Sequence, residues 1–184
     1  MKKHLQSIAL LNEDNENEKI RAYIDQLMQS SDLLEFSKIC DHKILNNILC
    51  RYKKVCNDLH IAFHADIRSN TTAFLSDSDV TSLFCNLLDN AVEASNHIKD
   101  SYIEITAAQR KHTPFIIITM INSCACNPFS PNGELISSKP DPQAHGFGIK
   151  SIEKIVHNYN GNMQMYYDGE TFTFHTIIML KMKP

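Results

Sequence analysis

The chain has 184 residues and a formal net charge of −3, and 43% of its residues are hydrophobic against 21% charged. This balance is ordinary for a globular protein and lacks the basic excess of nucleic-acid-binding proteins, so we expect no nucleic-acid partner. No run reaches the roughly 18 consecutive apolar residues that predict a transmembrane helix.

Residues 1–60 carry two helical patterns. Apolar residues recur at helical spacing from Ile20 to Met28, and again from Ile44 to Leu59, where Asp41 is the predicted N-cap. Neither amphipathic stretch carries a core of its own, so each needs a partner surface. We predict that residues 1–60 form a helical hairpin, part of a dimerisation domain that pairs into a four-helix bundle.

Residues 61–184 alternate between strand and helix patterns. The predicted strands are "IAFHADI", "YIEITAAQ", "FIIITMI", "NMQMYY" and "TFTFHTIIML", the last two joined at an Asp168-Gly169 turn, and helical periods occupy residues 77–98 and 146–159. The pattern predicts an α+β fold class, in which the second domain is an α/β sandwich with a mixed, mostly antiparallel sheet and helices on one face. Residues 122–146 have no periodicity, and a loop this long is typical of a functional segment.

The six cysteines are predicted to be reduced thiols. In a chain of this length, for which we expect no secretory signal, a disulfide framework is the less favoured alternative. Cys124-Ala-Cys126 lacks the two-residue spacer of a zinc knuckle, which leaves a metal site there as a minor alternative.

The helix at 77–98 contains "NLLDNAVEAS", with Asn86 and Asn90 four residues apart on one face. If the apolar face of this helix packs on the sheet, the two amides would lie at its margin and face a cleft. Amide oxygen is a neutral hard ligand that suits Mg²⁺. Asp89 and Glu93 are candidates to position a water or a hydroxyl group. The alternative is that both asparagines are exposed helix polars.

The segment "HGFGIKS" places Gly146 and Gly148 just before a helix. Glycine lets the backbone approach a ligand closely, and a helix N-terminus offers free N–H groups to phosphate. Lys150 could add a point charge, whereas a simple glycine turn is the alternative. In "DGETFTF", Thr171 and Thr173 share a strand face, for which ordinary strand structure is the alternative.

Together these motifs resemble the catalytic ATP-binding domain of sensor histidine kinases, in the GHKL group with the Bergerat fold. "NLLDNAVEAS" looks like the N box, "HGFGIKS" like the second glycine box and "GETFTF" like the closing Gly-Thr motif. The resemblance covers residues 75–182 strongly. The form of the first two motifs is most similar to the branch of peptide-quorum-sensing kinases such as AgrC.

The resemblance implies ATP and Mg²⁺ as cofactors, with ATP between the N-box helix and a mobile lid at about 124–144. It implies roles for individual residues. Asn90 would be the Mg²⁺ ligand and Asn86 would flank the phosphates. Gly146 and Gly148 would offer backbone N–H groups to the phosphates, and Lys139 would contact a phosphate. Thr171 or Thr173 would lie near the adenine, and His145 would bind the lid or a phosphate unless it is a structural turn residue. Such a site suits phosphoryl transfer, which needs mainly positioning and charge neutralisation.

The sequence departs from the family at two positions of the expected site. Asn122 stands where most members carry an aspartate that accepts from the adenine amino group, and the glycines that follow that aspartate are missing. Glu93 stands where many members carry a basic residue. A carboxylate beside a triphosphate is unfavourable, so we expect weak nucleotide affinity.

The resemblance also implies the partners. We expect a protein histidine kinase, the cytoplasmic portion of a bacterial membrane-anchored receptor, which pairs as a homodimer through its N-terminal helices and passes phosphate to a response-regulator receiver domain. "KKHLQSI" matches only the end of the branch's phosphoacceptor motif, so the acceptor is expected before Met1, with His4 as the less favoured acceptor. This fragment would then be a weakened dimer unable to autophosphorylate. The alternatives are a degenerate nucleotide-binding signalling module and an anti-sigma type of serine kinase.

Overall fold

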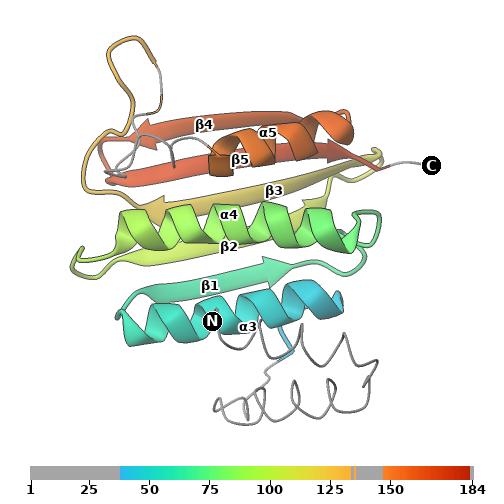
Figure 1. Cartoon of the computed structure of the whole chain (residues 1–184), viewed down its shortest axis with the longest axis horizontal. Coiled ribbons are helices and arrows are strands. Elements are labelled where there is room, and N and C mark those ends of the chain that lie inside the picture. Colours follow the sequence, from blue (N-terminus) through green and yellow to red (C-terminus); the bar gives the residue numbers. More distant parts are fainter. Residues whose placement is uncertain (1–37, 134, 136–146, 183–184) are drawn as a thin grey trace, which may run out of the picture. The chain divides into compact units, whose positions relative to one another are not determined.

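The computed structural model describes residues 38–133, 135 and 147–182, which belong to one compact unit that begins at Lys38 (Figure 1). The elements follow in chain order: α3 (Lys43–Asp58), β1 (Ala62–Ile67), α4 (Asp77–Ser95), β2 (Tyr102–Gln109), β3 (Phe115–Ser123), α5 (Phe147–Asn158), β4 (Asn162–Asp168) and β5 (Thr173–Lys181). The predicted helix from Ile20 to Met28 lies outside the described residues.

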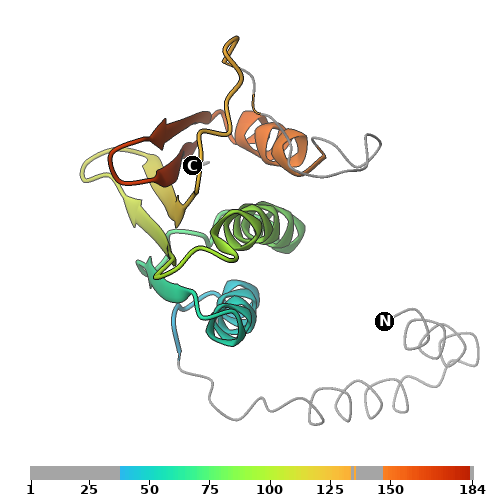
Figure 2. The same ribbon diagram turned by 90° about the vertical axis from the view of Figure 1, so that its left-hand side faces the viewer.

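The five strands form one sheet in the order β1-β2-β3-β5-β4. β1 pairs with β2 in parallel, and the other three pairs are antiparallel. Helices α3, α4 and α5 all lie on the same face of the sheet (Figure 2). The predicted α+β sandwich, with a mixed and mostly antiparallel sheet covered on one face, is therefore confirmed.

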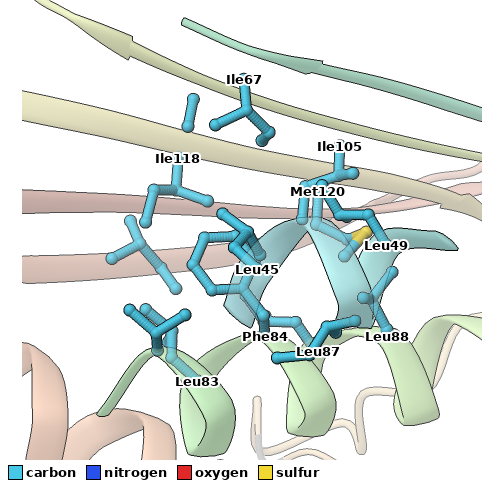
Figure 3. Packing of buried hydrophobic residues seen from close by; sticks show 14 of the residues in the cluster. Leu45, Leu49, Ile67, Leu83, Phe84, Leu87, Leu88, Ile105, Ile118 and Met120 are labelled. Carbon is cyan, nitrogen blue, oxygen red and sulfur yellow. The ribbon is translucent and has the colours of Figure 1, made fainter. Parts of the chain in front are cut away.

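The core lies between the sheet and its three helices (Figure 3). Helix α4 contributes Leu83, Phe84 and Leu88, each fully buried, because apolar residues at this spacing share one face of a helix. The central strand β3 adds Ile118 and Met120 from the side that faces the helices. Burial of a side chain of this size stabilises a fold by roughly 1.5–3 kcal/mol.

Helix α3 packs into this same core. Leu45 and Leu49 are fully buried, and Tyr52 and Cys56 complete its inward face. We predicted this helix as the second arm of a dimerisation hairpin, but its apolar stripe meets α4 and β1 within the sheet domain. The compact unit thus begins before residue 60, and the dimerisation role of residues 1–60 stays a prediction.

The predicted N-cap of α3 is wrong by one residue. His42 caps the helix, because its Nδ1 accepts from the Leu45 amide at 3.4 Å. The Asp41 carboxylate instead accepts from the backbone amide of Asn70 at 2.9 Å, in the loop that follows β1. A loop contact distant in sequence has taken the better capping side chain away from the helix.

None of the described helices is long and apolar enough to span a membrane. All six cysteines lie in the described part of the chain and are free thiols. Among the described residues, no group of three or more His, Cys, Asp or Glu side chains is placed to hold a metal ion.

Gly161 allows α5 to turn tightly onto the end of β5, and we expect Gly161→Ala to destabilise the domain. An added methyl group would press on the carbonyl oxygen of Met179 and lie 2.9 Å from Leu180 Cδ2. Overpacking of this kind costs about 1–3 kcal/mol, to be measured by urea denaturation. Gly169→Ala is the matched control, because its methyl group meets only Tyr167 at 3.7 Å. Equal stability of the two variants would contradict this account of the turn.

Candidate functional site

The N-box asparagines and the glycine turn meet at the start of α5. Asn86 and Asn90 lie on the same side of α4, and both are partly exposed. A methyl group placed on Gly148 would lie 3.3 Å from Asn86 Oδ1 and 3.9 Å from Asn90 Oδ1. The two amide oxygens therefore flank one point beside the first turn of α5, which only a residue without a side chain leaves open.

This arrangement combines two kinds of polar group. Amide oxygens are hard, neutral cation ligands. The first amides of a helix have no partner within the helix, and they carry the positive end of its dipole. The first turn of α5, from Phe147 to Lys150, thus places anion-binding groups beside cation-binding ones. Lys150 is exposed on the same turn.

Asp89 is adjacent to Asn90 in sequence but is engaged elsewhere. Its Oδ1 accepts from the Tyr52 hydroxyl of α3 at 2.6 Å, and that hydroxyl also lies 3.4 Å from the Cys85 carbonyl oxygen. Tyr52 is only 4% exposed, and burial together with this carboxylate raises the pKa of its hydroxyl well above the ordinary range. Asp89 is thus a link to α3. Glu93, the other predicted acidic member, is exposed one turn later.

Asn122 lies at the end of β3, on the face that the helices cover. It is 3% exposed, and it alternates in phase with the buried Ile118 and Met120. Its Nδ2 donates to the Ser123 carbonyl oxygen at 2.9 Å, which fixes the orientation of the amide. The Ser95 hydroxyl donates to the same oxygen at 3.2 Å, so the end of α4 and the end of β3 are joined beside Asn122.

The two predicted threonines lie together. Thr171 and Thr173 hydroxyls are 2.7 Å apart, and Thr173 Oγ1 is 2.8 Å from His175 Nε2. Ile178 and Leu180 of the same strand point into the helix-covered core, so alternation places Thr173 and His175 on the opposite face. The structure therefore places Thr173 on the face of the sheet away from the helix that carries Asn86 and Asn90, and the expected place of Thr171 or Thr173 near the adenine stays a prediction.

Three predicted site residues, Lys139, His145 and Gly146, lie outside the described residues, as does His4. The described part of the predicted lid comprises residues 124–133 and 135. It includes Phe129, whose ring centroid lies 5.8 Å from that of Phe174.

Sequence reasoning missed two groups that line this region. Ser82 and Ser151 join α4 to α5 through their hydroxyls, and Phe174 pairs with Asn122 across β3 and β5. The position of Ser82, four residues before Asn86, was a visible signal, since that spacing places both on one helix face. Phe174 carries no such signal, because its contact depends on strand register.

The comparisons with known proteins agree with this geometry. The family model described as "GHKL domain" matches residues 75–179, more than half of the chain, so the chain belongs to the GHKL family. No curated protein matches the chain significantly.

Solved structures of histidine kinases share the fold. The chain is similar to the catalytic domain of histidine kinase ThkA at 15% identity and a TM-score of 0.57, over 77% of this chain and 93% of that one. It is similar to the mycobacterial sensor histidine kinase MprB at 15% identity and a TM-score of 0.56, over 77% and 95%. For the Acinetobacter baumannii histidine kinase AdeS the values are 14% and 0.52, over 100% and 93%. At these identities the likeness concerns the fold.

The Tyr52 hydroxyl is expected to stabilise the joint between α3 and α4. Tyr52→Phe removes a buried donor to a carboxylate, which should cost about 1.5–3 kcal/mol in urea denaturation at neutral pH. Folding raises the pKa of Tyr52. The contribution of Tyr52 to the free energy of unfolding is therefore fully present below the ordinary tyrosine pKa of about 10, and it is lost as the pH rises above that value. The variant should therefore lose less stability than the parent above that pH.

Tyr102→Phe is the matched control, since Tyr102 lies on the sheet at 39% exposure. Its stability should stay within about 0.5 kcal/mol of the parent. If Tyr52→Phe were equally harmless, the bond to Asp89 would not hold the two helices together.

Proposed function

We propose that this chain is the ATP-binding kinase portion of a two-component sensor histidine kinase. It binds Mg-ATP and directs transfer of the γ-phosphoryl group to a histidine, for relay to the receiver domain of a response regulator. The observation that carries the proposal is the meeting of Asn86, Asn90 and Gly148 at the N-terminus of α5. Membership of the GHKL family supports it.

The residues at this point fit a phosphate chain with its cation. The space beside Gly148 would be filled by any side chain, and it is bordered by two amide oxygens and the first amides of α5. Asn90 would hold Mg²⁺, and the α5 amides would receive phosphate oxygens. Bound Mg²⁺ would neutralise charge on the transferred phosphoryl group.

Asn122 would receive the adenine. Because its Nδ2 is used by the Ser123 carbonyl oxygen, the amide presents its oxygen as the acceptor for the adenine amino group. Phe174, its neighbour across the strands, would offer an apolar ring to the base. The contact lacks the charge of an aspartate, which is consistent with weak nucleotide affinity.

The wider setting is part of the same proposal. The parent would be a membrane-anchored receptor of the quorum-sensing, AgrC-like branch, with this chain on the cytoplasmic side. Residues 1–60 would contribute to a homodimer.

A second function, a nucleotide-binding signalling module without kinase activity, is favoured by the neutral Asn122. Binding of Mg-ATP without acid-labile histidine phosphorylation, when a histidine-bearing segment of the same receptor is supplied, would favour it over the first.

Calorimetric titration of Mg-ATP into the parent and Asn90→Ala is the direct test. We expect the parent to bind, and Asn90→Ala or removal of Mg²⁺ to weaken binding by about tenfold or more, since a cation ligand is lost. Asn57→Ala, an exposed asparagine at the end of α3, is the matched control and should bind like the parent. A parent that binds no Mg-ATP would overturn both proposed functions.

Gly148→Ala separates binding from folding. Alanine favours a helix interior over glycine by about 1 kcal/mol, which opposes the cost of the close contact to Asn86, so the variant should stay folded with a stability within about 1 kcal/mol of the parent. The new methyl group would lie 3.3 Å from Asn86 Oδ1 and occupy part of the space proposed for the phosphate chain and its cation, so affinity for Mg-ATP should fall by about tenfold. Unchanged affinity in a folded variant would place the phosphates away from this turn.

A further inference from the structure

A hydroxyl pair ties the N-box helix to the helix of the glycine turn. Ser82 Oγ of α4 lies 2.8 Å from Ser151 Oγ of α5. Asn86 Nδ2 donates to the Ser82 carbonyl oxygen at 2.7 Å and lies 3.4 Å from Ser82 Oγ. The amide of Asn86 is therefore connected through Ser82 to the second turn of α5.

These contacts determine which atom of the Asn86 amide faces Gly148. A backbone carbonyl oxygen can only accept, so the nitrogen of the amide has to face Ser82. The amide is planar, so its oxygen then points the other way, toward Gly148. With Ser82 Oγ accepting from Asn86, the Ser82 proton is available to Ser151. The hydroxyl pair thus supports one orientation of the amide over its flipped form.

The orientation limits what Asn86 can bind. Its exposed atom is an acceptor, and phosphate oxygens at neutral pH are acceptors as well, so the two do not bond directly. A divalent cation accepts an oxygen ligand, and the waters around Mg²⁺ donate hydrogen bonds. The oxygen of Asn90 flanks the same point beside Gly148.

We propose that Ser82 and Ser151 are positioning residues that hold Asn86 with its oxygen toward the α5 N-terminus, so that Asn86 serves the cation and its waters rather than the phosphates. Ser151 lies three residues after Gly148 on the same helix face, so the same bond holds the glycine turn at a set distance from α4. The inference rests on the proposed Mg-ATP site and replaces the phosphate role first expected for Asn86.

The test compares ATP affinity in Mg²⁺ and in EDTA for the parent, Ser82→Ala and Ser151→Ala. Loss of one supporting hydrogen bond should weaken binding by about three- to tenfold in Mg²⁺, and it should leave metal-free binding unchanged. Ser82→Thr keeps the hydroxyl and should bind ATP in Mg²⁺ with the affinity of the parent. Thr81→Val is the matched control, because the Thr81 hydroxyl bonds only to the Asp77 carbonyl oxygen within α4.

A double-variant cycle shows whether the serines act through Asn86. In the Asn86→Ala background, Ser82→Ala should cause no further loss. A loss that persists in that background, or one of equal size with and without Mg²⁺, would overturn the inference while the proposed function stands. Failure of the parent to bind Mg-ATP would overturn both. If Ser82→Ala does not fold, Ser151→Ala carries the same comparison from the other helix.

Discussion

The structure depends on how α4 lies on the sheet. Its apolar stripe, with Phe84 and Leu88 fully buried, has one favourable rotation about the helix axis. Successive residues in a helix are rotated by about 100° about its axis, so the rotation of α4 also sets the direction in which each of its polar side chains points. Asn86 and Asn90 emerge at the margin of the stripe, beside α5. The core packing that stabilises the domain therefore also sets the direction of the Asn86 and Asn90 side chains.

Both ends of α4 form hydrogen bonds to elements that carry residues of the candidate site. At its start, the Tyr159 hydroxyl at the end of α5 donates to Asp79 at 2.8 Å and accepts from the Ser76 amide at 3.2 Å. At its end, Ser95 bonds the last carbonyl oxygen of β3, beside Asn122. Helix α5 and strand β3 are thus both held against the same helix.

Periodicity, and for β3 a continuous apolar run, predicted every described helix and strand. The resemblance of the motifs to those of the family, and not periodicity, brought Asn86, Asn90 and Gly148 into one predicted site. Sequence reasoning failed where a partner distant in sequence decides the outcome. Asp41 is not the cap of α3, since Asn70 takes its carboxylate. The orientation of the Asn86 amide needed the Ser82 contact, which no one-dimensional pattern contains.

Asp89 and Asn90 are neighbours in the chain but have different partners. This difference directs the Asp89 carboxylate away from the candidate site. The helical rotation between them directs Asn90 toward Gly148 and Asp89 toward Tyr52. A carboxylate beside a phosphate chain would oppose binding, whereas here a buried hydroxyl holds it against α3. One turn of α4 therefore contacts α3 through an acid and α5 through amides. The turn of α4 that carries the proposed cation ligand is therefore also held by α3, through the bond between Tyr52 and Asp89.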